Sequence, residues 1–523
     1  MTPKTHPLVK TWGFFVCLGL FVALWMSRPE HPLLDLVPFP KWTQVQHSNA
    51  APLNPEAIDT LLAGYASYEP SIPEKLPASV VPDTDSLALT ASASQSIQQS
   101  QSVHHSNSAV PPYPREIEQI ALHPNLQLQG SEAAFNQLAR FFHRLHNKQH
   151  DGPLHVFHFG DSQIEGDRIT HTLRDAWQAR WGGYGMGYLA PKPLVAPASI
   201  RQSTSPGWNR HARFGRRDTT IQHKRFGLLA SFASHESSTE AEGEPWIRLE
   251  PNQRARLAEQ QVHSVKMLFG RTDSNARMSC FVDTTLIGTF LLPADSSGSE
   301  LTVPITASSG PVVFQSIEFQ FEGAVPEVDA IGLMPDSGLV FHNVAMRGSS
   351  GTLFRQLDRT QFSRQLQSQD VGMVILQFGG NAVPYIADSA AVERYGQWFA
   401  SQIRLFQSLI PQAAIVVIGP SDMATKQDQY MVTYPMLVPV RNALRQAAMA
   451  ENVLFWDVFE VMGGEGSMAA WVASEPKLAS SDHVHFTRRG AKKIASFLVQ
   501  SLDAEWAVWH MNQDSNPLAA PLP

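Results

Sequence analysis

Cysteine and net positive charge are both scarce in this sequence. It has two cysteines, Cys17 and Cys280, in regions of very different composition, so we do not expect a disulfide framework. Its formal charge is −7, which gives no reason to expect a nucleic acid as a partner. Internal repeats are lacking as well. At 523 residues, however, the chain is long enough for about three domains with normal cores.

The N-terminus carries an unbroken apolar run, Trp12–Met26, preceded by two lysines. No polar face interrupts this run, which argues against an amphipathic helix on a globular core. A small-x-small cleavage site is absent after it, and Cys17 does not lie in a lipobox. The run is somewhat shorter than the roughly 20 residues of a comfortable membrane span. We therefore predict that residues 1–28 are a signal anchor, with a signal peptide as the alternative, and that the N-terminus faces the cytoplasm.

Segments of low apolar content flank the central part of the chain. Residues 91–108 are almost entirely Ser, Gln, Ala, His and Asn, and proline is frequent around them. Such a composition offers too little apolar surface to offset the entropy of ordering. We predict a disordered linker over residues 29–115, with a short helix possible near Asp59–Tyr68, and a disordered tail over 511–523.

Strand and helix patterns alternate in two separated regions, 116–202 and 336–510. The predicted strands are short apolar runs with helical patterns between them, namely Leu154–Phe159, Leu339–Ala345, Val371–Phe378, Ala413–Gly419 and Val453–Val458. Alternation of this kind predicts an α/β domain with a doubly wound parallel sheet. Ligands of such sheets bind at the carboxyl ends of the strands, so these ends are where a site is expected.

The texture changes over residues 203–335, where several short β-type segments follow one another at short spacing. This pattern predicts an all-β sandwich inserted into the α/β domain. Within it, the stretch Arg210–Arg225 is strongly basic. It could meet an anionic glycan, but an exposed, solvated loop is the simpler interpretation.

Three side chains with complementary chemistry fall at predicted strand exits. Ser162 follows the strand Leu154–Phe159, and Asp482 and His485 lie three residues apart before the last helical pattern. A serine hydroxyl becomes a useful nucleophile when a histidine takes its proton, and a carboxylate orients that histidine. The sequence therefore predicts a serine esterase with Ser162, Asp482 and His485 as catalytic residues.

Four blocks in order resemble SGNH/GDSL hydrolases: Gly160–Ser162, the segment Asn343–Gly351, Gly379–Asn381, and Asp482 with His485. The resemblance implies a flavodoxin-like α/β fold. It also implies that the oxyanion hole consists of the N–H groups of Ser162 and Gly348 and the side-chain amide of Asn381. No cofactor and no metal are implied.

The large β-rich insertion between the first two blocks is similar to that of peptidoglycan O-acetylesterases of the bacterial envelope, in which it resembles a carbohydrate-binding module. The segments Gly160–Thr170 and Gly348–Thr352 also resemble this branch. The resemblance implies that an O-acetylated envelope glycan is the substrate and that acetyl-serine is the intermediate. It implies a location on the periplasmic side of the inner membrane, held there by the N-terminal segment or free after cleavage. Gln163 and Ala382 depart from the common pattern, which leaves the specificity open.

Other functions fit the same residues. An O-acetyltransferase would use the same triad with a sugar hydroxyl as acceptor, and a non-catalytic glycan-binding protein or a lipid esterase would keep the fold. A metal site is a further alternative, because His158, Asp161, Asp482 and His485 have suitable ligand atoms.

Overall fold

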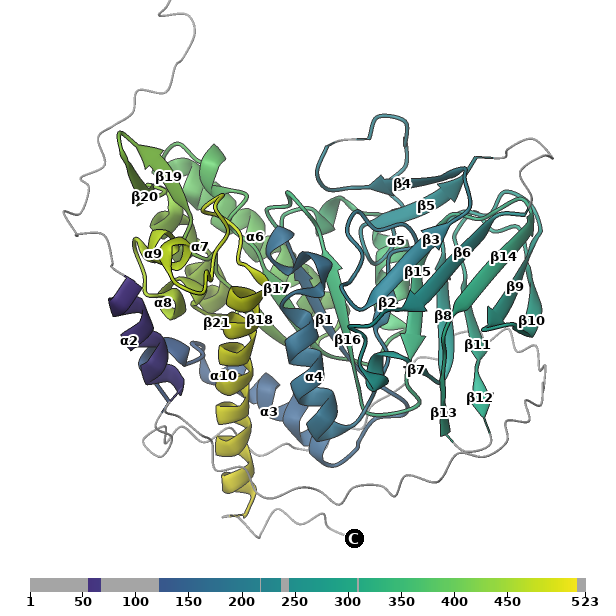
Figure 1. Cartoon of the computed structure of the whole chain (residues 1–523), viewed down its shortest axis with the longest axis horizontal. Helices are drawn as coiled ribbons and strands as arrows, with labels where there is room; N and C mark the ends of the chain where they lie inside the picture. Colours follow the sequence, from purple (N-terminus) through teal and green to yellow (C-terminus); the bar gives the residue numbers. More distant parts are fainter. Residues whose placement is uncertain (1–54, 67–121, 217, 237–243, 308–309, 515–523) are drawn as a thin grey trace, which may run out of the picture. The chain divides into compact units, whose positions relative to one another are not determined.

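The computed structural model describes residues 55–66, 122–216, 218–236, 244–307 and 310–514. Its central element is a five-stranded parallel sheet in the order β16-β1-β17-β18-β21 (Figure 1). The strands are β1 (Leu154–Gly160), β16 (Leu339–Ala345), β17 (Val371–Gln377), β18 (Ala414–Ile418) and β21 (Leu454–Trp456). The predicted parallel α/β sheet is confirmed, and each strand lies within one or two residues of its predicted bounds.

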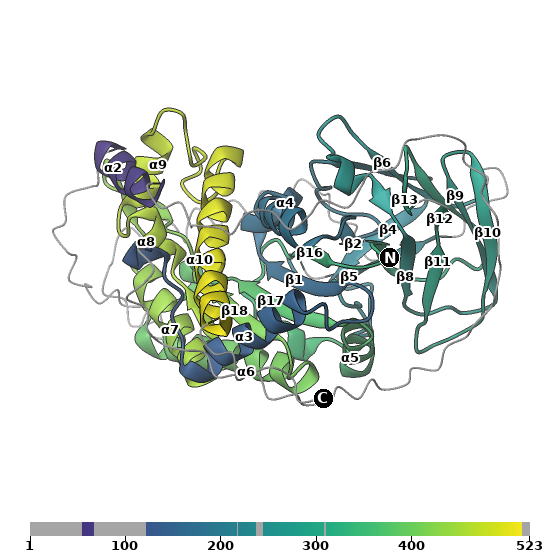
Figure 2. The same ribbon diagram turned by 90° about the horizontal axis from the view of Figure 1, so that it is seen from below.

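Helices cover both faces of this sheet, as the doubly wound topology requires. Their bounds are α3 (Glu132–His146), α4 (Thr170–Trp181), α5 (Arg359–Gln367), α6 (Ser389–Leu409), α7 (Leu437–Ala450), α8 (Val458–Met462), α9 (Ser467–Ala473) and α10 (Arg488–Asp514). Helices α3, α4 and α10 contact one another on one face (Figure 2). Helices α5, α6 and α7 pack on the other.

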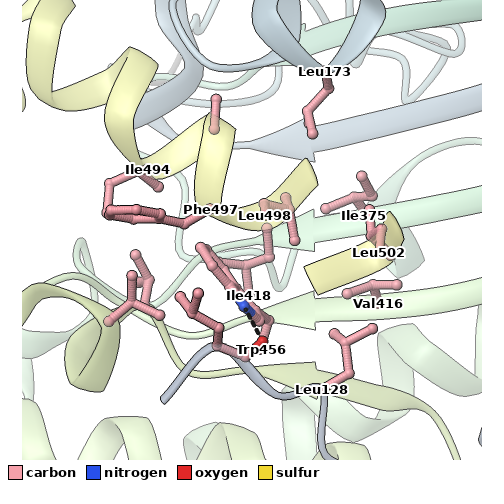
Figure 3. Close-up of a cluster of buried hydrophobic side chains, with 14 of the residues drawn as sticks. Leu128, Leu173, Ile375, Val416, Ile418, Trp456, Ile494, Phe497, Leu498 and Leu502 are labelled. Carbon is pink, nitrogen blue, oxygen red and sulfur yellow. Dashed lines mark hydrogen bonds between the residues drawn. The ribbon is translucent and has the colours of Figure 1, made fainter. Parts of the chain in front are cut away.

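The apolar strands divide their side chains between these two faces. On β17, Met373 and Ile375 belong to the core under α10, whereas Val374 and Leu376 belong to the core under α6. Successive side chains of a strand point to opposite faces, so a strand buried on both sides needs a continuous apolar run. Figure 3 shows the first core, where the indole N–H of Trp456 donates to Ser501 Oγ at 3.0 Å.

The apolar residues of Gln163–Trp181 recur at helical spacing in the sequence, but this segment does not form one continuous helix. Residues Ser162–Asp167 form a kinked 3₁₀ segment (η4), and α4 begins only at Thr170. Gly166 and Asp167 have φ angles of 67° and 63°, and this left-handed backbone interrupts the helix. Ser162 therefore lies on a tight turn and not at the first turn of an α-helix.

The region between β1 and β16 forms two main antiparallel sheets. One has the order β10-β9-β14-β6-β3, and the other has the order β11-β8-β15-β5-β4, with β2 paired to β15. The strands are β2 (Gly187–Leu189), β3 (Ile200–Thr204), β4 (Trp208–Ala212), β5 (Ser231–His235), β6 (Trp246–Pro251), β7 (Gln261–Val262), β8 (Ser264–Phe269), β9 (Ala276–Val282), β10 (Thr285–Leu292), β11 (Glu300–Pro304), β12 (Thr306–Ala307), β13 (Gly310–Val313), β14 (Ile317–Gly323) and β15 (Val328–Met334).

These sheets enclose a core of their own, which confirms the inserted β region. Val265 and Ile331 face Met278 and Phe319 of the other sheet. The β8–β15 sheet is buried on its second face as well, because Leu268 and others of its residues join the core under α6. The insertion is therefore packed firmly against the α/β region. We name the segment 187–334, which holds these strands, the β insertion.

The segments that flank the α/β region contain ordered helix at both ends. Within the predicted linker, Pro55–Ala66 forms helix α2, which overlaps the short helix that we considered possible at Asp59–Tyr68, and its Ile58, Leu62 and Tyr65 bury apolar surface against the α/β core. Helix α10 extends to Asp514, into the predicted tail. The predicted anchor at residues 1–28 lies outside the described residues. Among the helices that the structure describes, none is both long and apolar enough to cross a membrane.

Candidate active site

The structure brings Ser162, His485 and Asp482 together at the carboxyl edge of the parallel sheet. Ser162 Oγ lies 2.7 Å from His485 Nε2, and His485 Nδ1 lies 2.8 Å from Asp482 Oδ2. Ser162 follows β1, whereas Asp482 and His485 lie in the loop before α10. These contacts order the imidazole between a hydroxyl that can lose a proton and a carboxylate that accepts from the other ring nitrogen.

The local backbone prepares Asp482 for this contact. Its Oδ1 accepts hydrogen bonds from the N–H groups of Val484 and His485, at 2.9 and 3.0 Å. Partial burial alone would raise the pKa of Asp482, but these hydrogen bonds and the one to the imidazole lower its pKa below the ordinary value. Asp482 is therefore ionised under neutral conditions and can stabilise a protonated His485.

The turn that holds Ser162 is built from residues with little steric freedom. A Cβ atom on Gly160 would lie 2.9 Å from Ile164 Cδ1 and 3.1 Å from the carbonyl oxygen of Gln377, so no larger residue fits there without displacement. Asp161 caps the turn by accepting from the N–H of Gln163 at 2.9 Å. The Gly160–Asp161–Ser162 block therefore fixes where the hydroxyl emerges from the sheet.

Asn381 and Gly348, the predicted oxyanion donors, lie in the loops after β17 and β16. Asn381 Nδ2 donates to Asp161 Oδ2 at 3.1 Å and to the carbonyl oxygen of Ser349 at 3.2 Å. Gly348 has a φ angle of 80°, and its N–H donates to no residue that the structure describes. Because both amide protons of Asn381 have partners, donating to an oxyanion requires one of these bonds to be shared or exchanged.

The buried carboxyl of Asp161 has an unusual environment. Burial raises its pKa to about 6, although bonds from the Gln163 N–H and Asn381 and the nearby His485 lower it. Its direct contact is with Asn381, whereas Asp482 contacts the imidazole. We therefore interpret Asp161 as the residue that orients the Asn381 amide.

Gln163 is a residue whose contacts sequence reasoning did not anticipate. Its Nε2 donates to the carbonyl oxygen of Val484 at 2.6 Å and to Ser421 Oγ at 3.2 Å, and its Oε1 accepts from the N–H of Phe486 at 3.4 Å. The amide thus bonds the main chain on both sides of His485. These contacts connect the nucleophile turn to the histidine loop across more than 300 residues of sequence.

A pocket of about 220 Å³ opens beside these groups. Ser162, Asn381 and His485 line it together with Tyr385 and Tyr434. Tyr385 is 87% exposed, which places an aromatic side chain at the mouth of the pocket. The space suits a small acyl group attached to a larger molecule that remains outside.

Side chains that could bind a metal ion cluster at a different place from the metal site that we considered at His158, Asp161, Asp482 and His485. Within the described ranges, Asp167, His171 and Glu259 have ligand atoms close enough to share an ion. The guanidinium of Arg174 already contacts both carboxylates, at 2.5 Å to Asp167 and 3.7 Å to Glu259. Because Arg174 already neutralises both carboxylates, we interpret these residues as a structural ion-pair network.

Comparisons with known proteins bear on the fold. Neither a family model nor a curated protein matches the chain. Among solved structures, a peptidoglycan O-acetylesterase matches with a TM-score of 0.56 and 20% identity, covering 73% of this chain and 99% of that one. An acetyl xylan esterase, AlAXEase, matches at 15% identity with a TM-score of 0.25, covering 32% of this chain and 81% of that one. A family two carbohydrate esterase from Cellvibrio japonicus matches at 9% identity with a TM-score of 0.23, covering 59% and 99%.

The first of these matches covers 73% of this chain, which is more than the α/β region alone contributes, so it includes part of the β insertion as well. The described part of this protein therefore has the fold of SGNH/GDSL esterases with an inserted β region. The resemblance drawn from the four sequence blocks is confirmed at the level of the fold.

Proposed function

We propose that this protein is a serine esterase that removes O-acetyl groups from a cell-envelope glycan, with peptidoglycan as the proposed glycan. The observation that carries the proposal is the chain of contacts from Ser162 through His485 to Asp482, at 2.7 and 2.8 Å. Serine hydrolases need a hydroxyl, an imidazole and a carboxylate connected in this order, whereas residues that only stabilise the fold have no need of it. The fold shared with a peptidoglycan O-acetylesterase supports the choice of substrate class.

In the proposed reaction, His485 takes the Ser162 proton while Ser162 Oγ attacks the acetyl carbonyl carbon. His485 then gives this proton to the departing sugar oxygen, which leaves acetyl-serine. Water, deprotonated by His485, then attacks the acetyl carbon, and His485 returns the proton to Ser162 Oγ as the acetyl–Ser162 bond breaks and the acetyl group leaves as acetic acid, which ionises to acetate. If a sugar hydroxyl replaces water, the same steps transfer the acetyl group.

The tetrahedral intermediate needs donors for its negative oxygen. The N–H groups of Gly348 and Ser162 and the Asn381 amide are the proposed donors. Removal of one oxyanion donor typically lowers turnover about 100- to 1000-fold. We expect Asn381→Ala to lower kcat by a factor in this range with little change in KM, measured with a small aryl acetate.

For the location, we propose the periplasmic side of the inner membrane. The support is the apolar run Trp12–Met26 with lysines before it and the composition of the following linker. A fusion of residues 1–60 to an enzyme that is active only after export would test this directly.

Acetate release from O-acetylated peptidoglycan tests the proposed function. The full chain should release acetate, and Ser162→Ala should abolish the release. Ser279→Ala, which changes a partly buried serine on β9 of the β insertion, is the matched control and should retain activity. Activity on an aryl acetate alone would support the chemistry but not the glycan. Glycan binding without release from either substrate would favour a non-catalytic binding protein.

A further inference from the structure

The β insertion reaches the catalytic edge through the loop that follows β4. Gly215 of this loop lies directly against Gly348, since a Cβ atom on Gly348 would be 3.6 Å from Gly215 Cα. A Cβ atom on Gly215 would in turn lie 3.5 Å from the carbonyl oxygen of Arg347. Within the basic stretch Arg210–Arg225, the part at Gly215 therefore lies beside the proposed oxyanion donor. Arg216, Gln222 and Lys224 of the same stretch are exposed, as expected for a solvated loop.

A second cavity, of about 70 Å³, lies between this loop and the turn that carries Ser162. Glu165 lines it from the nucleophile turn, and Arg210 and Phe214 line it from the β insertion. Leu194 and Val195 line it as well and are 54% and 43% exposed. The cavity thus combines a guanidinium group with exposed apolar side chains.

The two carboxylates that line this cavity, Glu165 and Asp167, are already paired with Arg347 and Arg174. Glu165 is buried and accepts from Arg347 Nε at 3.0 Å and also from Arg347 Nη2. Arg210 is partly buried, and its guanidinium has no hydrogen-bond or ion-pair partner among the residues that the structure describes. It lies over the ring of Phe214 at 5.1 Å. Burial and, to a smaller degree, the charge of Arg347 lower the pKa of Arg210, whereas Glu165 raises it.

Arg168 adds a third guanidinium close to the same turn. Its Nε and Nη1 donate to the carbonyl oxygens of Glu165 and Phe486, at 2.9 and 3.4 Å, and not to a carboxylate. Burial lowers the pKa of Arg168, whereas the charge of nearby Glu165 raises it. Neither Arg168 nor Arg210 donates to a carboxylate among the described residues, and an anionic ligand would give them such a partner.

We infer that the cavity between the β insertion and the nucleophile turn is a substrate subsite for a carboxylate next to the acylated sugar, with Arg210 as its principal cation. The inference rests on the proposed function and narrows its substrate class to acidic glycans. The planar guanidinium suits bidentate recognition of a carboxylate. Phe214, Leu194 and Val195 offer the apolar surface on which the carbon face of a sugar ring can lie.

The test compares two forms of one substrate. Disaccharide fragments of O-acetylated peptidoglycan are used with their carboxylate free and with the same carboxylate converted to a methyl amide. We expect the full chain to prefer the charged form by about tenfold or more in kcat/KM, because a charge-assisted hydrogen bond contributes about 1.5–3 kcal/mol. Arg210→Gln should bring this ratio close to one, and Arg210→Lys should leave an intermediate ratio.

Arg277→Ala is the matched control, because it removes an exposed arginine from β9 of the other sheet of the β insertion, where Arg277 pairs with Glu322. This variant should keep the wild-type ratio. A ratio near one in the wild type, or a ratio unchanged in Arg210→Gln, would overturn the subsite. Silence of the wild type on both fragments and on an aryl acetate would instead overturn the proposed function, so the two failures are distinguishable.

Discussion

At the scale of single residues, the candidate site forms where the turn of Ser162 meets the loops that carry His485 and Asn381. Asp482 and His485 are neighbours in sequence, and Ser162 follows an apolar strand, so local patterns were enough to find them. Gln163 was different. Its partners Val484 and Phe486 lie more than 300 residues away, and no local pattern reports a contact over that separation. Its position after the nucleophile was visible in the sequence, but its function was not.

The contacts of Gln163 predict a positioning role. Gln163→Ala should lower kcat about 10- to 100-fold with little change in KM, because the histidine loop loses its fixed distance from Ser162. The reaction of Ser162 with a phosphonylating probe should slow in parallel, which a purely structural role would not produce. Gln178→Ala is the control, since Gln178 is equally buried but bonds Leu339 at the opposite end of β16. Equal effects of the two substitutions would contradict this role.

At the scale of elements, strands were easier to predict than the segment after the nucleophile. Continuous apolar runs mark strands that are buried on both faces, and β1, β16 and β17 follow this rule. The kink at Gly166 and Asp167 breaks an otherwise helical pattern. It is held by Arg174 of α4, whose guanidinium contacts both Asp167 and Glu259 of the β insertion. An ion pair between distant elements leaves no periodic signal in the sequence.

This network predicts a large effect of removing its cation. Arg174→Met should lower the free energy of unfolding by about 3–5 kcal/mol, because Asp167 and Glu259 would remain buried without a counter-charge. Urea denaturation measures the change. Arg201→Ala removes an exposed arginine from the pair with Glu250 and should cost at most about 1 kcal/mol. A similar decrease in the free energy of unfolding in both variants would contradict a larger contribution from the buried network.

At the scale of the whole molecule, the packing of the β insertion on the α/β region matters most. The short strands of 203–335 predicted an insertion, but their composition does not say which side faces the catalytic edge. The β insertion contacts the α/β region at two separate places. Gly215 meets Gly348 beside the site, and Asp329 of β15 accepts from Gln361 and Gln365 of α5, at 2.7 and 2.6 Å.

Asp329 makes this boundary sensitive to pH. Burial raises its pKa to about 8, from an ordinary value of 3.8, and nearby Glu327 also raises it. The protonated form is therefore favoured in the folded state, so this contribution to stability is complete below about pH 4 and is lost as the pH rises through about 8. Where Asp329 alone titrates differently, the free energy of unfolding should fall by up to about 1.4 kcal/mol per pH unit.

The comparison of Asp329→Asn with the wild type isolates this effect. Because the variant cannot ionise at this position, its stability relative to the wild type should increase from pH 5 to pH 8 in urea denaturation. Asp428→Asn, which changes an exposed carboxylate between β19 (Ala424–Gln427) and β20 (Tyr430–Thr433), should show no such trend. A constant difference between Asp329→Asn and the wild type across this range would contradict the assignment.

The most direct test of the central claim is covalent labelling of the full chain with a fluorophosphonate, with the adduct located by peptide mass spectrometry. If Ser162 is activated by His485, we expect one adduct, on Ser162, that is absent in Ser162→Ala and forms far more slowly in His485→Ala. An unlabelled wild-type protein, or labelling of Ser162 at the same rate without His485, would contradict it.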